Sequence, residues 1–221
     1  MISEVSSSPS GASTDTPGAG GTPSRRFGYT AVAVLVVGLL LGLGAGLVIP
    51  GLRTPGDDSV EAGFLRDMST HHAQAVEMAM IAHTGSDDPA IVTLSSDIAT
   101  TQQGQVGYMQ SWLRDWHLSP TGTTEPMAWI PGSEGAIVNG LMPGMATPDQ
   151  MATLREATGK DLDVQFLTLM RAHHVGGVHM AQEALKLSDN TDVTWLAQSM
   201  VAAQQGEIQL IDSLLKRIQT P

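Results

Sequence analysis

Apolar residues follow two different patterns along this chain. Residues 29–49 contain no charged side chain over 21 positions, which at 1.5 Å per residue is enough to cross a bilayer core of about 30 Å. From residue 57 onward, apolar side chains recur at intervals of three and four, the spacing of amphipathic helices. The pattern therefore predicts a transmembrane helix over 29–49, followed by an all-α domain.

The second part of the chain repeats itself. When the sequence is shifted by 102 residues, Phe64 to Leu113 aligns with Phe166 to Leu215 without a gap, and 17 of 50 positions are identical. The matches include two His-His pairs and two Gln-Gln-Gly segments. Each half is thus expected to form the same structural unit. The glycines of the matched segments, Gly104 and Gly206, are expected to let helices approach closely.

Helix start and stop signals divide each repeat into two helices. Asp88-Pro89 is an N-cap followed by proline at the first helical position, and Gly85 lies near the end of the helix before it. The repeats span about 57–118 and 160–219, and a proline-rich crossover, 119–159, contains one short helix over about 147–158. Two helical hairpins bury their apolar faces most completely by packing together, which predicts a four-helix bundle.

The region before the bundle divides into three parts. Seventeen of the first 24 residues are Ser, Gly, Pro or Thr, a composition typical of disorder, so 1–28 is interpreted as a disordered cytoplasmic tail. Arg25 and Arg26 precede the apolar segment and only Arg53 follows it. This bias places the amino terminus in the cytoplasm and the domain 57–221, after a linker 50–56, outside it. A signal peptide cleaved near Gly44, which would leave a secreted protein, is the alternative.

Composition excludes several functions. The chain has 22 acidic and 11 basic residues, a formal charge of -11 and no cysteine. The acidic excess argues against nucleic acid as a partner, and the absence of cysteine excludes thiolate metal sites and disulfides. No common catalytic motif is present, so catalysis is not predicted. Histidine and methionine remain as the residues with distinctive chemistry.

Polar side chains lie on the apolar faces of all four predicted helices. At 100° per residue, His71 and His72 flank the apolar stripe that contains Met68, and the repeat places two further histidines around Met170. The inward polar residues are His71, His72, Gln102, Gln105, His173, His174, Gln204 and Glu207. Because burying such groups without partners costs several kcal/mol, they require an explanation.

Two explanations are open. In the first, the histidines bind a metal ion with Met68, Met170 and Glu207, while Gln102, Gln105 and Gln204 orient the imidazole rings. A Met-Pro-Gly-Met turn in the crossover supplies two more candidate ligands, Met142 and Met145. In the second, the same residues form a hydrogen-bond network in a structural or partner-binding ectodomain. A redox enzyme with one or two metal ions is a third alternative.

Ligand chemistry favours copper among the metals. Imidazole suits Cu(II), imidazole with thioether suits Cu(I), and 11 of the 12 methionines lie in the predicted bundle. Zinc remains an alternative, since it accepts two or three histidines with a carboxylate. A di-iron centre is disfavoured because Glu207 is the only carboxylate near the middle of an inward face.

These motifs resemble a known family. The Phe-Leu-x-x-Met-x-x-His-His block at 64–72, its copy at 166–174, the Met-Pro-Gly-Met turn at 142–145 and the Gln-Gln-Gly-Glu-Ile segment at 204–208 are similar to domain-of-unknown-function family 305, over about residues 57–219. The resemblance implies a ferritin-like four-helix fold in exported or membrane-anchored bacterial proteins, some associated with copper binding and copper tolerance.

One position departs from the family pattern, which usually has Glu where this chain has Gln105. A symmetric pair of carboxylate-bearing sites is therefore not expected, and the second half is the stronger candidate site. The resulting hypothesis is a membrane-anchored extracytoplasmic protein that buffers, delivers or confers tolerance to copper.

Overall fold

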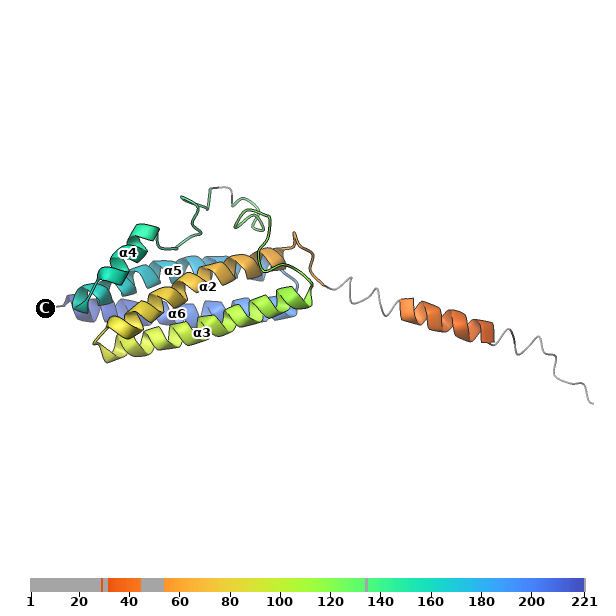
Figure 1. The fold of residues 1–221 in the computed structure, drawn as a ribbon, viewed down its shortest axis with the longest axis horizontal. Helices are drawn as coiled ribbons and strands as arrows, with labels where there is room; N and C mark the ends of the chain where they lie inside the picture. Colours follow the sequence, from red (N-terminus) through yellow and green to blue (C-terminus); the bar gives the residue numbers. More distant parts are fainter. Residues whose placement is uncertain (1–28, 30–31, 45–53, 134, 221) are drawn as a thin grey trace, which may run out of the picture. The chain divides into compact units, whose positions relative to one another are not determined.

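The computed structural model describes residues 29, 32–44, 54–133 and 135–220 (Figure 1). Over the larger part, the helices are α2 (Val60–Gly85), α3 (Pro89–Asp115), α4 (Pro148–Glu156), α5 (Gly159–Leu187) and α6 (Thr191–Gln219). The ranges that the structure describes contain no strand, only an isolated β-bridge between Val138 and Leu141. The prediction of an all-α fold is confirmed.

All of these helices except α5 begin at a side chain that caps them. Ser59 accepts a hydrogen bond from the backbone N–H of Ala62 at the start of α2, and Asp88 precedes Pro89 at the start of α3. Thr147 and Gln150 form a capping box at α4. Capping satisfies N–H groups that have no partner within the helix, and it fixes the points at which the chain changes direction.

The long helices are arranged as two hairpins. α2 packs along α3, α5 packs along α6, and the main packing between the hairpins joins α2 to α5 (Figure 1). The short helix α4 rests on α2 and α5. The crossover and α4 thus lie on the α2–α5 side of the bundle.

The core of the bundle consists of two apolar clusters. The first cluster joins the start of α2 and the end of α3 to the end of α5 and the start of α6. The second cluster joins the end of α2 and the start of α3 to the start of α5 and the end of α6. The first cluster includes Phe64, Met68, Met109, Met180 and Met200, and the second includes Met78, Leu94, Phe166, Met170 and Ile211. In every long helix, a segment that contains at least one buried polar side chain separates the two clusters.

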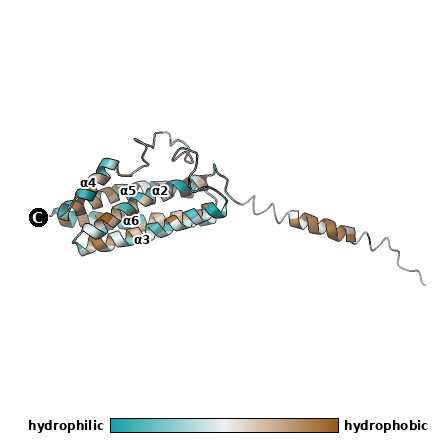
Figure 2. Ribbon diagram, viewed as in Figure 1, coloured by the Kyte–Doolittle hydropathy of each residue, from teal (hydrophilic) through white to brown (hydrophobic). Residues whose placement is uncertain are grey.

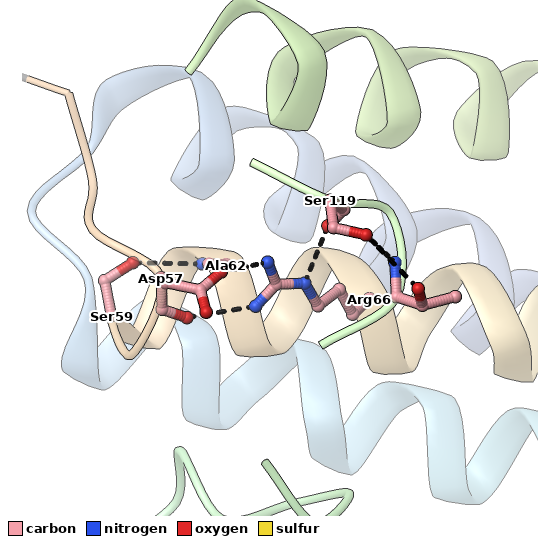
Figure 3. A network of polar contacts seen from close by, with 6 residues as sticks. Asp57, Ser59, Ala62, Arg66 and Ser119 are labelled. Atoms are coloured by element: carbon pink, nitrogen blue, oxygen red, sulfur yellow. Dashed lines mark hydrogen bonds and ion pairs between the residues drawn. The ribbon is translucent and has the colours of Figure 1, made fainter. Parts of the chain in front are cut away.

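Two charged side chains of α2, Arg66 and Asp67, attach the crossover. The guanidinium of Arg66, 7% exposed, donates to Asp57 Oδ1 at 2.5 Å and to the carbonyl of Ser119 at 3.0 Å (Figure 3). Asp67 Oδ2 accepts from the backbone N–H of Met127 at 2.7 Å and from the indole N–H of Trp129 at 2.8 Å. Burial raises the pKa of Asp67, and these two hydrogen bonds partly offset the rise. The crossover is therefore fixed near the amino-terminal end of α2.

The predicted transmembrane segment is only partly described. Residues 32–44 are helical and almost entirely hydrophobic (Figure 2), with exposed side chains such as Leu35 and Leu39. Among the residues described, no helix has the length and apolarity needed to span a membrane. A transmembrane helix over 29–49 is therefore not supported. Positions 30–31 and 45–49, the tail 1–28 and linker residues 50–53 lie outside the described residues.

The predicted role of the matched glycines is wrong. A Cβ atom added at Gly104 or Gly206 would meet no other atom within 4 Å, because both positions face open space. The close approaches occur instead at Gly176 and Gly177 of α5. A Cβ at Gly176 would collide with the carbonyl of Pro143, and one at Gly177 would lie 2.5 Å from Gln204 Oε1.

Candidate metal centre

A polar layer crosses the bundle between the two apolar clusters. Each long helix contributes two residues, at the point where its apolar segments change from one cluster to the other. The polar layer consists of His71 and His72 of α2, Gln102 and Gln105 of α3, His173 and His174 of α5, and Gln204 and Glu207 of α6.

The four histidines are withdrawn from solvent, each at most 1% exposed. The rings of His71 and His173 face each other, with centroids 3.7 Å apart and planes inclined by 35°. These two residues occupy the same position in the two repeats. The duplication therefore brings equivalent imidazoles together where α2 packs against α5.

The other two histidines have equivalent partners. His72 Nε2 lies 2.8 Å from Gln105 Oε1, and His174 Nε2 lies 2.5 Å from Glu207 Oε2. Since a carboxylate only accepts hydrogen bonds, Nε2 of His174 carries a proton, and Nδ1 of the same ring is the atom left without a partner. The amide oxygen of Gln105 imposes the same tautomer on His72. Glu207 is 20% exposed, so this half of the polar layer reaches solvent.

The Met-Pro-Gly-Met turn lies against the polar layer. His71 Nε2 donates to the carbonyl oxygen of Pro143 at 3.0 Å, which leaves the lone pair of His71 on Nδ1. Met142 is 5% exposed and belongs to the first apolar cluster, and Met145 is half-buried against the same cluster. The fold thus brings both thioether residues of the turn to the side of the bundle where the histidine rings stack.

Met68 and Met170 do not share one environment. Both are fully buried one helical turn before a His-His pair, but Met68 lies in the first apolar cluster and Met170 in the second. The two residues therefore flank the polar layer from opposite sides. The first cluster is the richer in sulfur, because it also holds Met109, Met127, Met142, Met180 and Met200.

Burial keeps His71, His72 and His173 neutral. Desolvation lowers the pKa of His71 to about 4 and that of His72 to about 3, in the second case with repulsion from His71. Desolvation, with repulsion from His71, also holds the pKa of His173 well below 6.5. A neutral ring has a lone pair to donate, so these three side chains have the protonation state that a metal ligand needs at neutral pH.

The polar layer is unusually short of hydrogen-bond partners. Eight buried side-chain nitrogen or oxygen atoms among the described residues have no partner, and seven of them lie in this layer; the eighth is on Asp163. They are Nδ1 of His71, His72 and His174, Nε2 of His173, both amide atoms of Gln102, and Oε1 of Gln204. Four of the seven are imidazole nitrogens, one on each histidine, so the donor set fits a metal that accepts nitrogen.

The free nitrogens do not yet converge on one point. Over the part of the chain that the structure describes, no group of three or more His, Asp or Glu side chains is already arranged to hold a metal ion. Rings would have to turn about their side-chain bonds to bring the unpartnered nitrogens together.

Comparison with known proteins identifies the family. Residues 61–215 match DUF305, a domain of unknown function. The chain belongs to this family.

Solved structures of two DUF305 proteins and of CopM have a similar fold. A protein of Streptomyces coelicolor, provisionally described as secreted, is 42% identical with a TM-score of 0.68, over 74% of this chain and 96% of that one. A DUF305 fragment from Deinococcus radiodurans is 30% identical with a TM-score of 0.60, over 72% and 96%. CopM in its Cu(II)-bound form is 21% identical with a TM-score of 0.57, over 72% and 97%. The comparison with curated proteins gives no match.

Sequence reasoning missed the residues that hold the turn in this DUF305 protein. Gln74 of α2 forms hydrogen bonds with the backbone N–H and carbonyl of Ala146. Gly176 of α5 leaves room for the carbonyl of Pro143, which packs against it. The available signal was the repeat, because Gln74 and Gly176 are equivalent positions at which the two halves differ.

Proposed function

We propose that this DUF305 protein binds copper in the polar layer and serves outside the cytoplasm as a copper buffer or chaperone. The observation that carries the proposal is the group of seven unpartnered buried polar atoms. Leaving a buried donor or acceptor without a partner costs about 1–3 kcal/mol. A metal ion would relieve that cost for several of these atoms at once, whereas a core of leucines would never have incurred it.

The donor types favour copper. Four imidazoles, with Met142 and Met145 at the two ends of the turn that His71 bonds, offer a mixed nitrogen and thioether set, which suits Cu(I) and, through the imidazoles, Cu(II). CopM, whose fold is similar, is known in Cu(I)-bound, Cu(II)-bound and silver-bound forms. Zinc, bound by two histidines and Glu207, is the competing ion. With one carboxylate in the layer, the set does not suit a di-iron centre.

The residues have separate roles in this proposal. The four histidines would hold the ion, and Met142 or Met145 would complete the set for a monovalent ion. Gln105 and Glu207 accept the Nε2–H protons of His72 and His174, which fixes the tautomers and keeps Nδ1 as the donor. Met68 and Met170, on opposite sides of the layer, would line the two ends of the site. Gln102 and Gln204 would turn their free amide atoms toward the rings.

A hydrogen-bond network without metal is the competing function. Three of the four histidines already have a partner through Nε2, and a rigid polar core could support a partner-binding ectodomain. In that case buried water would occupy the remaining positions, and the layer would show no preference for copper.

A titration separates the two functions. The purified chain is titrated with Cu(I), Cu(II) and Zn(II) against competing chelators, beside a variant in which His71, His72, His173 and His174 are all alanine. A matched control replaces the three exposed histidines, His83, His117 and His179. We expect tight copper binding by the wild type and the control and a loss of at least about 100-fold in the layer variant. Equal, weak binding by all three proteins would contradict the proposal.

The proposed location has a separate basis. The DUF305 relative from Streptomyces coelicolor is provisionally described as secreted, and the arginines around 29–49 favour an outward bundle. Residues 29–49 would serve as a membrane anchor or as an export signal that is removed. Cell fractionation with sequencing of the mature amino terminus distinguishes these outcomes. Recovery of the intact chain from the cytoplasm would contradict the location.

A further inference from the structure

The Met-Pro-Gly-Met turn has a backbone conformation set by its sequence. Pro143 and Gly144 are its central residues, Gly144 has a φ of +81°, and the N–H of Met145 bonds to the carbonyl of Met142 at 3.1 Å. A positive φ at the third position is the conformation that glycine adopts without strain. The turn is therefore a rigid unit, and its position depends on how it is attached to the bundle.

One side of the turn is attached to α2 by side chains. Gln74 Nε2 donates to the carbonyl of Ala146 at 2.9 Å, and the N–H of Ala146 donates to Gln74 Oε1 at 2.7 Å. This amide pair satisfies both backbone groups of the residue that follows the turn. Together with the bond from His71 to Pro143, it connects the turn to α2 at two points three residues apart on the helix.

The other side of the turn rests on the backbone of α5, and Gly176 has no side chain at this contact. The Pro143 carbonyl lies so close to Gly176 that any Cβ there would collide with it. Gly144 lies against the backbone of Ala172 and His173 in the same way. The turn thus sits over the α2–α5 contact, next to the stacked rings of His71 and His173.

The duplication explains why Gln74 differs from its counterpart. Gln74 and Gly176 are 102 residues apart and occupy the same position in the two repeats. A single turn cannot make the same contact with both halves, so one copy carries the amide that binds the turn and the other carries no side chain at all.

We infer that Gln74 is a positioning residue, which holds the thioethers of Met142 and Met145 beside the His71–His173 pair and so raises affinity for soft monovalent ions. The inference rests on the proposed copper function. The effect of Gln74 on affinity should differ between two kinds of ion. Imidazoles alone satisfy Cu(II), whereas Cu(I) and Ag(I) gain from thioether ligands. Loss of Gln74 frees the turn without removing any ligand.

The experiment compares Gln74→Ala with Gln209→Ala, a control that removes an exposed glutamine from α6. In the metal-free proteins, oxidation of Met142 and Met145 by dilute hydrogen peroxide is followed by mass spectrometry. In the loaded proteins, Ag(I) and Cu(II) affinities are measured by chelator competition, and metal–sulfur scattering by X-ray absorption. We expect faster oxidation of both methionines in Gln74→Ala, roughly tenfold weaker Ag(I) binding, reduced metal–sulfur scattering and unchanged Cu(II) affinity.

A double-mutant cycle keeps the test independent of general damage to the fold. Replacing Met142 and Met145 with leucine conserves core volume and should weaken Ag(I) binding by at least the same factor, because it removes the thioethers themselves. Adding Gln74→Ala to that variant should cause no further loss. Ag(I) affinity that is unchanged in Gln74→Ala, or losses that add, would overturn this inference alone. Failure of the wild type to bind any of the ions would overturn the proposed function and, with it, the inference.

Discussion

A single amide-to-carboxylate difference makes the two halves of the polar layer unequal. Gln105 accepts from His72, whereas Glu207 accepts from His174, with the same ring nitrogen and the same spacing of 33 residues. A carboxylate raises the basicity of the ring to which it is bonded and adds a negative charge close to a bound cation. The half that carries Glu207 should therefore contribute more to the affinity for a divalent ion than the half that carries Gln105.

The substitution Glu207→Gln tests that asymmetry. It removes the charge and retains the size and hydrogen-bonding capacity of the side chain, so Cu(II) affinity should fall by roughly 10- to 100-fold, with a smaller effect on Ag(I). The matched variant Gln105→Glu should strengthen Cu(II) binding. Both effects are measured by chelator competition. Unchanged Cu(II) affinity in Glu207→Gln would show that the carboxylate does not support the site.

At the scale of the elements, packing of the crossover against α5 depends on missing side chains. Gly176 and Gly206 are both helical glycines, yet the first touches the Pro143 carbonyl and the second faces open space. Position along a helix therefore does not reveal the role of a glycine in this fold. The role of each glycine depends on which segment packs against its helix, and a sequence repeat cannot show which segment that is.

The two glycines should respond oppositely to alanine. Gly176→Ala should lower the free energy of unfolding by about 1–3 kcal/mol, because a backbone carbonyl has to move aside. Gly206→Ala should raise it by up to about 1 kcal/mol, through helix propensity alone. Urea unfolding of the metal-free proteins measures both. Stabilisation by Gly176→Ala would mean that the turn does not lie on α5 as described.

The whole molecule is built around buried neutral imidazoles, and this makes its stability depend on pH. The pKa values of His71, His72 and His173 are lower in the folded chain than the value of 6.5 for an unfolded one. At a pH between the folded-state and unfolded-state pKa values, the unfolded state binds more protons than the folded state. Stability is therefore complete above pH 6.5 and decreases as the pH falls toward 4.

We expect the metal-free protein to lose on the order of several kcal/mol of unfolding free energy between pH 7 and pH 4.5. Chemical unfolding at a series of pH values measures the loss. The variant lacking His83, His117 and His179 should show the same loss, since those side chains are exposed. A flat profile over this range in the wild type would contradict neutral burial of His71, His72 and His173.

The sequence was sufficient to predict much of this architecture. Helical spacing and the 102-residue repeat predict the hairpins, and the 100° rotation per residue turns His71 and His174 inward. Placing residues at 100° intervals treats each helix separately, so it could not show that Met68 and Met170 lie on opposite sides of the polar layer. The contact between Gln74 and Ala146 joins residues 72 positions apart, and no local pattern records such a contact.

Anomalous X-ray diffraction from crystals of the copper-loaded chain, recorded on both sides of the copper absorption edge, locates the bound copper. We expect a copper peak inside the bundle, within bonding distance of at least two of His71, His72, His173 and His174. A peak only at His83, His117, His179 or the surface carboxylates, with the polar layer holding water, would contradict it.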